Sequence, residues 1–192
     1  HVELDMRRPD HRDKLDHDVL RTFQERLKQG YRARTAAENV GAGYHTLAEA
    51  NVHVGCTAVG IARAAYEHAL AYAHTRRAGG KKIAQHQQVQ HRLFHMFRKV
   101  EAARALVRRV ATYNATAPLP ALQGSAAAKV NATQTAFEVA SEALQIFGGN
   151  GMSLEYPMEK LLRDARAMLI ADGCNEVLAM KGGSLLVNPE LL

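Results

Sequence analysis

Tryptophan is absent from this chain of 192 residues, and only 6% of the residues are aromatic, whereas alanine is abundant. A core with few aromatic rings and many alanines is typical of closely packed helices, because small side chains let helix backbones approach each other. The chain also lacks any apolar run of about 18 residues, the length that a membrane-spanning helix needs. We therefore expect a helical protein that does not cross a membrane.

Cysteine is scarce as well: Cys56 and Cys174 are far apart and form no CxxC pair. Their spacing excludes a zinc ribbon and a disulfide framework, so a reducing, cytoplasmic compartment is expected. The first residues, HVELDMRRPDHRDK, are charged and lack the apolar segment of a secretory signal peptide. Because the chain begins with His rather than Met, we expect it to be part of a longer protein.

Positive charge exceeds negative charge by six, and 47% of the residues are hydrophobic. This composition is that of a globular protein, and the length suits a single domain. Modest basicity is common and only weakly indicates binding to nucleic acid. The basic face from Arg98 to Arg109 has no interleaved aromatic residues, so it favours a solvated or subunit-facing surface, and no nucleic-acid partner is expected.

Apolar residues recur every three or four positions along most of the chain, which predicts helices. The helices are expected over residues 16–28, 47–76, 87–115, 125–147, 158–171 and 176–181. Three long antiparallel helices and a shorter one predict an all-α fold, an up-down four-helix bundle. Strand signals are sparse throughout the sequence.

Local signals predict where these helices begin, end and bury their side chains. GAGY at 41–44 is expected to break any helix, and GGNG at 148–151 to end one. Ser125 is the expected N-cap of the helix that follows it. The expected apolar stripes include Cys56 in the first long helix and Phe97 in the second.

Two segments carry more specific patterns than periodicity. They are AYAHTRRAGGKKIAQHQQVQ at 71–90 and QIFGGNGMSLEYPMEKLLRDARAMLIADGCNEV from Gln145 onward. Together they resemble the C-terminal helical domain of the flavin-dependent acyl-CoA dehydrogenases, over roughly residues 52–181. The resemblance implies that residues 47–192 form this bundle domain. Residues 1–46 are then an N-terminal extension, a remnant of a preceding β-domain plus a short helix.

The resemblance also implies a reaction and a set of site residues. The family removes the α-proton of an acyl-CoA with a carboxylate base, while the β-hydrogen leaves as hydride to the flavin, giving a trans-2-enoyl-CoA. By resemblance Asp172 is the base, and Gly173 approaches the substrate thioester. The residues implied to contact FAD are Arg76, Gln87, Gln145, Ile146, Phe147, Gly148, Gly149, Cys174, Asn175 and Glu176.

The family's FAD site lies between subunits, and Arg76 and Gln87 match positions that hold the cofactor of a neighbouring subunit. A homodimer or homotetramer is therefore implied, or a partner chain that supplies missing domains. An electron-transfer flavoprotein is the implied electron acceptor.

Several positions depart from the family's pattern. The base is normally glutamate, and a carboxylate withdrawn by about 1 Å can lower the rate about 10²-fold. Gly79 stands where an aromatic residue packs on the flavin, Cys174 where a threonine hydrogen-bonds it, and Asn51 where an arginine is common. Some members carry the base on the long helix instead, where Glu49 lies one residue out of register.

Other interpretations stay open beside these. Asp172 can be a turn residue beside a glycine, and Cys174 is favoured as a packing residue. His91 and His95 have the spacing of metal ligands, but without a third ligand a solvated helix face is favoured, and no metal site is expected. The family's N-terminal helical domain and middle β-domain do not occur in these 192 residues. The chain is therefore either part of an acyl-CoA dehydrogenase or a non-catalytic assembly domain of a related complex.

Overall fold

The computed structural model describes residues 36–188, which contain five helices and a short hairpin. The helices are α2 (Ala36–Thr75), α3 (Gln87–Thr116), α4 (Leu122–Phe147), α5 (Met158–Met168) and α6 (Asn175–Val187). Strands β1 (Arg77–Ala78) and β2 (Lys81–Lys82) pair antiparallel, and the 3₁₀ turns are η1 (Ile83–Gln85) and η2 (Gly148–Met152). The chain divides into compact units at 1–43 and 44–192, and the candidate sites lie in the second unit.

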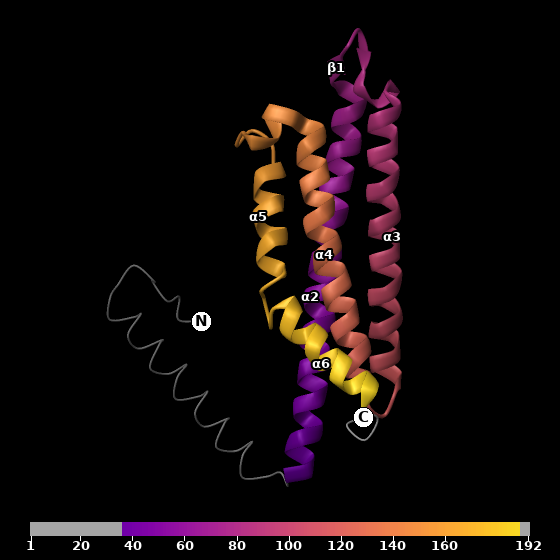
Figure 1. Ribbon diagram of the computed structural model, residues 1–192, viewed down its shortest axis with the longest axis vertical. Coiled ribbons are helices and arrows are strands. Elements are labelled where there is room, and N and C mark those ends of the chain that lie inside the picture. The colour runs from indigo at the N-terminus through magenta and orange to yellow at the C-terminus, as the bar shows by residue number, and fades with distance from the viewer. Residues whose placement is uncertain (1–35, 189–192) are drawn as a thin grey trace, which may run out of the picture. The chain divides into compact units, whose positions relative to one another are not determined.

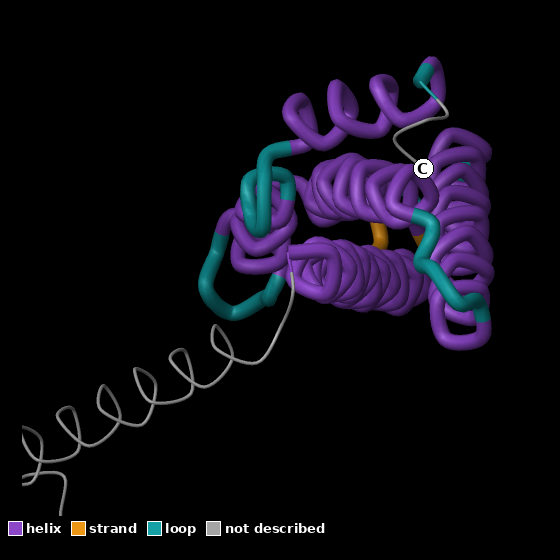
Figure 2. The backbone as a smooth tube through the Cα atoms, turned by 90° about the horizontal axis from the view of Figure 1, so that it is seen from below, coloured by secondary structure: helices purple, strands orange, loops and turns teal. Residues whose placement is uncertain are grey.

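Helices α2 to α5 run alternately up and down, and α4 packs against α3, α5 and α6 (Figure 1). Seen from below in Figure 2, the long helices lie side by side, with α6 crossing beside them. The predicted all-α, up-down bundle is confirmed, and α6 is a further helix laid against it. The expected helix at 16–28 lies outside the described residues, and the domain boundary after residue 46 stays a prediction.

Alanine builds the core of the unit. Each long helix contributes small or medium side chains at spacings of three and four, so that the backbones approach closely. The fully buried alanines of α2 are Ala48, Ala58, Ala62, Ala65, Ala69 and Ala73, and those of α4 are Ala128, Ala132, Ala136, Ala140 and Ala143. Larger buried side chains come mainly from α3, namely Leu93, Met96, Val100, Val107 and Val110. The alanine-rich composition therefore corresponds to the closely packed helices that it predicts.

Two residues of the expected apolar stripes lie outside this core. Cys56 is exposed. Phe97 is 45% exposed, and its ring lies 6.0 Å from that of Tyr66, while Met96 takes the core position. The buried series on α3 steps from residue 93 to 96 and then to 100, which leaves position 97 at the edge of the stripe.

Three predicted boundaries in helices other than α4 are wrong. GAGY at 41–44 lies inside α2, because glycine lowers helix stability by only about 1 kcal/mol and the flanking alanines, leucine and glutamates favour a helix. The helix expected over 158–171 ends at Met168, where the chain tightens into turns. The helix expected over 176–181 extends over Asn175–Val187, since its two internal glycines do not stop it.

Ser125 is not an N-cap, because α4 begins one turn earlier at Leu122. Asn114 of α3 explains the difference. Its Oδ1 accepts the Ala121 N–H at 3.0 Å, and its Nδ2 donates to Ser125 Oγ at 2.9 Å. A side chain from the preceding helix thus supplies the acceptor at the start of α4, and the Ser125 hydroxyl is buried inside the helix.

The predicted end of α4 is confirmed. Gly148 follows Phe147 with φ 59°, a conformation that glycine adopts without a steric cost. Its N–H donates to the carbonyls of Leu144 and Gln145, and η2 then turns the chain toward α5. Within residues 36–188, the helices include none with both the length and the apolar character needed to span a bilayer.

Candidate functional site

The turn between α5 and α6 carries Asp172, the predicted base. Asp172 has φ 50° and Gly173 has φ 99°, so two consecutive residues lie in the left-handed region. Glycine adopts this region freely, whereas an aspartate there costs about 1 kcal/mol. The Asn175 N–H closes the turn by donating to the Leu169 carbonyl at 3.1 Å. Both Asp172 and Gly173 are exposed, so a ligand can reach them.

A buried lysine lies beneath this turn. Lys129 of α4 is 0% exposed, and its Nζ donates to the Gly173 carbonyl at 2.7 Å and to Asn175 Oδ1 at 2.9 Å. Asn175 Nδ2 donates to Thr133 Oγ1 at 3.0 Å, and that hydroxyl donates to the Lys129 carbonyl at 2.9 Å. The polar cluster of Lys129, Thr133 and Asn175 therefore joins α4 to the first turn of α6.

The surroundings of the turn shift the pKa values of Lys129 and Glu176. Burial lowers the pKa of Lys129 from its usual value, and the nearby Cys174, Asp172 and Glu176 act to raise it. The pKa of Glu176 lies below its usual value, mainly because its own backbone N–H and then the Cys174 thiol hydrogen-bond its carboxylate. Glu176 is in the first turn of α6, where a negative charge also suits the helix dipole.

The other predicted cofactor residues lie at the hairpin end of the bundle, at the top of Figure 1. Helices α2 and α4 both end there, and α3 begins there with Gln87. Arg76 follows α2, and its side chain is exposed together with that of Gln87. Gln145, Gly148 and Gly149 are exposed at the end of α4, while Ile146 is half-buried and Phe147 is buried.

Aromatic rings hold this end together. Phe147 is stacked on Tyr72 with ring centroids 4.0 Å apart, and Tyr156 meets Phe147 edge-on at 5.2 Å. Asn150 Nδ2 donates to the Tyr72 hydroxyl at 2.9 Å. The Arg76 N–H donates to the Tyr72 carbonyl at 2.9 Å, which ties the predicted cofactor arginine to the same cluster. The Phe147 ring faces the protein interior, so a ligand at the surface would meet the backbone of this stretch.

The predicted site residues thus fall into two groups. Arg76, Gln87 and residues 145–149 lie at the hairpin end, and residues 172–176 lie at the α5–α6 turn (Figure 1). Helix α5, with 11 residues and a length of about 16 Å, lies between the groups along the chain. The roles of both groups stay predictions.

Lys129 and Thr133 are not among the site residues that the sequence predicts. A lysine in a helix is normally exposed, so residue type alone points away from the core. A signal was present all the same: Lys129 lies four residues from Ser125 and four from Thr133, and all three are buried on one face of α4. A polar residue at a position of the buried stripe is informative because it needs an internal partner.

The two residues noted on the long helix differ sharply in burial. Glu49 is exposed on α2. Asn51 is only 2% exposed, and its Oδ1 has no hydrogen-bond partner among the described residues. Asn51 lines a cavity of about 320 Å³ between α2, α4 and α6, together with Leu47, Leu122 and Leu178. The amide therefore lies in a largely apolar setting.

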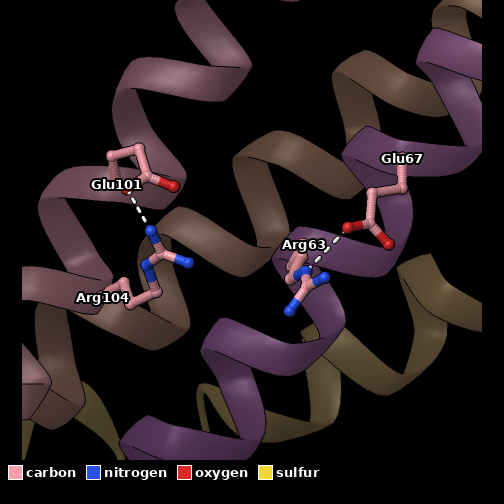
Figure 3. Close-up of polar contacts among 4 residues, drawn as sticks. All are labelled: Arg63, Glu67, Glu101 and Arg104. Carbon is pink, nitrogen blue, oxygen red and sulfur yellow. Dashed lines mark hydrogen bonds and ion pairs between the residues drawn. The ribbon is translucent and has the colours of Figure 1, made fainter.

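Two residues of the basic face of α3, Lys99 and Arg104, form ion pairs. Lys99 Nζ lies 2.6 Å from Glu138 of α4, which lowers the pKa of that carboxyl, and Arg104 pairs with Glu101 at 2.5 Å (Figure 3). Arg92 pairs with Glu142 of α4. These contacts fit the solvated or subunit-facing surface that the sequence favoured.

His91 and His95 also lie on α3, with ring centroids 4.3 Å apart, and burial and the neighbouring His91 lower the pKa of His95. In the described part of the chain, no group of three or more His, Cys, Asp or Glu side chains has a metal-binding arrangement.

Comparison with known proteins gives the family. Residues 42–183 match the family model described as "Acyl-CoA dehydrogenase, C-terminal domain". An acyl-CoA dehydrogenase of Bacillus subtilis is 40% identical over 142 residues, which are 71% of this chain and 37% of the relative. A 3-sulfinopropanoyl-CoA desulfinase of Advenella mimigardefordensis is 33% identical over 178 residues, which are 93% of this chain and 42% of the relative.

Solved structures agree with the sequence comparison. The butyryl-CoA dehydrogenase of Megasphaera elsdenii superimposes with a TM-score of 0.71 at 38% identity, and the match covers 74% of this chain and 37% of that one. The chain therefore spans less than half the length of the relatives it matches.

Proposed function

Because this chain belongs to the acyl-CoA dehydrogenase family, through the C-terminal domain matched at residues 42–183, we propose that the whole protein oxidises an acyl-CoA to a trans-2-enoyl-CoA with FAD. The observation that carries the proposal is the α5–α6 turn. It presents an exposed carboxylate, Asp172, where the resemblance expects the base, followed by a glycine that leaves room for a substrate.

The residues present suit FAD. Arg76 offers an exposed guanidinium, which pairs well with a pyrophosphate, and Gln87 offers an exposed amide. The exposed backbone of Gly148 and Gly149 lets an adenosine end come close. At the other group, Asn175 and Glu176 form the first turn of α6, and Cys174 precedes it. When bound, FAD supplies the acceptor for a hydride from the substrate.

In this reaction the residues of the chain remove the α-proton of the substrate. Asp172 takes the α-proton on a carboxylate oxygen, the β-hydrogen leaves with its electron pair, and a C2=C3 double bond forms. Gly173, without a side chain, allows the thioester to approach the turn.

The proposal includes partners. Residues at two places along the bundle suit a cofactor shared between subunits, so the protein works as a homodimer or homotetramer, or with a chain that supplies the missing domains. An electron-transfer flavoprotein reoxidises the flavin. The cytoplasm suits the two free cysteines, Cys56 and Cys174.

The experiment uses the full-length protein, loaded with FAD and mixed with a panel of acyl-CoA esters. We expect at least one ester to bleach the flavin absorbance. Asp172→Asn should retain flavin but lower the rate about 10²- to 10⁴-fold, the contribution of a general base. Asp172→Glu restores the missing methylene and is expected to keep or raise activity. Full activity in Asp172→Asn would disprove the role of the base. A protein that stays colourless with FAD would favour the assembly-domain hypothesis instead.

A second candidate is the removal of sulfinate from an acyl-CoA. The relative that matches 93% of this chain is a 3-sulfinopropanoyl-CoA desulfinase, whereas the match to the Bacillus subtilis acyl-CoA dehydrogenase covers 71%. Including 3-sulfinopropanoyl-CoA in the same panel separates the two functions. Sulfite release without flavin bleaching supports desulfination, and bleaching by a simple acyl-CoA supports dehydrogenation.

A further inference from the structure

Among residues 43–188, for which side-chain burial is described, Lys129 is the only charged residue that is buried. Burying an ammonium group costs several kcal/mol unless hydrogen bonds and nearby charges offset the loss of water. A leucine or methionine would fill the same space in an alanine-rich bundle without that cost. Lys129 therefore needs an explanation that packing does not give.

Both hydrogen bonds of the Lys129 ammonium go to the α5–α6 turn. The acceptors are the carbonyl of Gly173, directly after Asp172, and the side-chain oxygen of Asn175. Thr133, one helical turn further along α4, binds the other side of the same amide. The cluster thus fixes the turn on its C-terminal side, at two points within three residues of Asp172.

The conformation of the turn makes such a support necessary. Asp172 and Gly173 both have positive φ, and a non-glycine residue keeps that conformation only when its surroundings hold it. The surface side of the turn is exposed, so the support must come from below. The charges of Asp172 and Glu176 also favour the charged form of Lys129, against the effect of burial.

We propose that Lys129 is a positioning residue. Its ammonium holds the Gly173 carbonyl and the Asn175 amide, and through them it sets the direction in which Asp172 presents its carboxylate. This inference rests on the proposed function of Asp172 as the base. Lys129 is fully buried, whereas Asp172 is exposed, so the lysine acts on the substrate only through the turn.

The test compares Lys129→Met with wild type in the full-length, FAD-loaded protein. A base misplaced by about 1 Å costs about 10²-fold, so we expect kcat to fall by that factor while KM stays within about threefold. Lys99→Met is the matched control, because it removes a lysine that pairs with Glu138 at the surface between α3 and α4. It should leave kcat within about twofold.

Two further measurements distinguish positioning from general stability. In an Asp172→Asn background, Lys129→Met should change the residual rate less than about twofold, because the group that it positions is gone. Hydrogen exchange of the amides at 169–178 should speed up in Lys129→Met while the rest of α4 keeps its protection. Thr133→Val, which keeps the lysine, should shift kcat in the same direction by less. It serves as the test if Lys129→Met does not fold.

The results for these variants distinguish failure of the positioning role from failure of the proposed function. If Lys129→Met, or Thr133→Val in its place, leaves kcat unchanged, the positioning role is wrong even when Asp172→Asn is inactive. An equal loss in the wild-type and Asp172→Asn backgrounds also overturns it, because the lysine then acts on general structure. If Asp172→Asn keeps full activity, the proposed function fails first, and that result is separate from any effect of Lys129.

Discussion

The two groups of candidate residues are built in opposite ways. At the hairpin end, the rings of Tyr72, Phe147 and Tyr156 form an apolar cluster, and the candidate ligand contacts lie on exposed backbone and side chains around it. At the α5–α6 turn, a buried ammonium and an amide hold a strained backbone from within. Packing secures the first region, and directional hydrogen bonds secure the second.

We expect the aromatic cluster to contribute mainly stability, and the buried ammonium to contribute mainly precise positions of the atoms that it binds. A stacked cluster contributes much free energy of folding but tolerates small shifts, because dispersion is not directional. A buried ammonium contributes little net stability, since its desolvation offsets its hydrogen bonds, but it fixes acceptor positions closely. Changes at the hairpin end should therefore mainly alter unfolding and cofactor affinity, and changes at the turn should mainly alter turnover.

The largest expected effect on stability comes from breaking the apolar cluster. Phe147→Ala removes a buried ring from between two tyrosines and should lower the free energy of unfolding by about 3–5 kcal/mol. Urea denaturation of the full-length protein measures it. Leu154→Ala, at a residue 88% exposed in the neighbouring loop, is the control and should change stability by less than about 0.5 kcal/mol. Equal stabilities of the two variants would contradict the assigned core.

The second largest expected effect is on the affinity for FAD at the hairpin end. Arg76→Met removes an exposed charge that suits a pyrophosphate, so we expect the Kd for FAD to rise about 10- to 100-fold with unchanged thermal stability. Flavin fluorescence on titration reports it. Arg77→Met is the control, because the neighbouring guanidinium donates to the Gly80 carbonyl at 3.0 Å within the hairpin. If both variants weaken FAD equally, the effect is one of general charge.

At the turn, backbone conformation can be tested without touching the lysine. Gly173→Ala places a Cβ 3.6 Å from Leu178 Cγ, an ordinary contact, so its cost is that of φ 99°, about 1–2 kcal/mol. Gly183→Ala lies in α6 with nothing within 4 Å and should stabilise by up to about 1 kcal/mol. Thermal unfolding measures both, and opposite signs are the expected result. A neutral Gly173→Ala would mean that the turn relaxes easily.

Surface ion pairs provide the smallest effect and a baseline for both regions. Arg63 Nε lies 2.7 Å from Glu67 on α2, and both side chains are more than half exposed (Figure 3). Arg63→Met should change the free energy of unfolding by at most about 0.5 kcal/mol, and 1 M salt should remove the difference. A loss above about 1 kcal/mol would show that surface pairs matter more here than exposure predicts.

The bundle could be predicted closely because its signals are local and repeated. The second long helix was expected at 87–115 and covers Gln87–Thr116, since a long apolar period lies between a glycine turn and a proline-rich loop. The start of α4 could not be predicted in the same way. There a side chain of the preceding helix, Asn114, overrides the local preference for a serine cap.

The candidate site likewise has one part that local sequence predicts and one part that depends on the fold. A resemblance can nominate Asp172 because the segment around it is contiguous in sequence. Lys129 is 44 residues away from the carbonyl that it holds, and its spacing from Ser125 and Thr133 indicates burial but not the turn that it supports. Only the folded arrangement of α4 against α6 brings the two together.

Helix α4 connects the two regions with a single piece of backbone. Lys129 and Phe147 are 18 residues apart on it, about 27 Å along the axis. The spacing and relative rotation of the two regions are therefore set by the number of residues between them. One inserted residue would turn one region by about 100° against the other and move it by about 1.5 Å. The contacts proposed for the two regions thus depend on a fixed length of this helix, whatever its surface residues are.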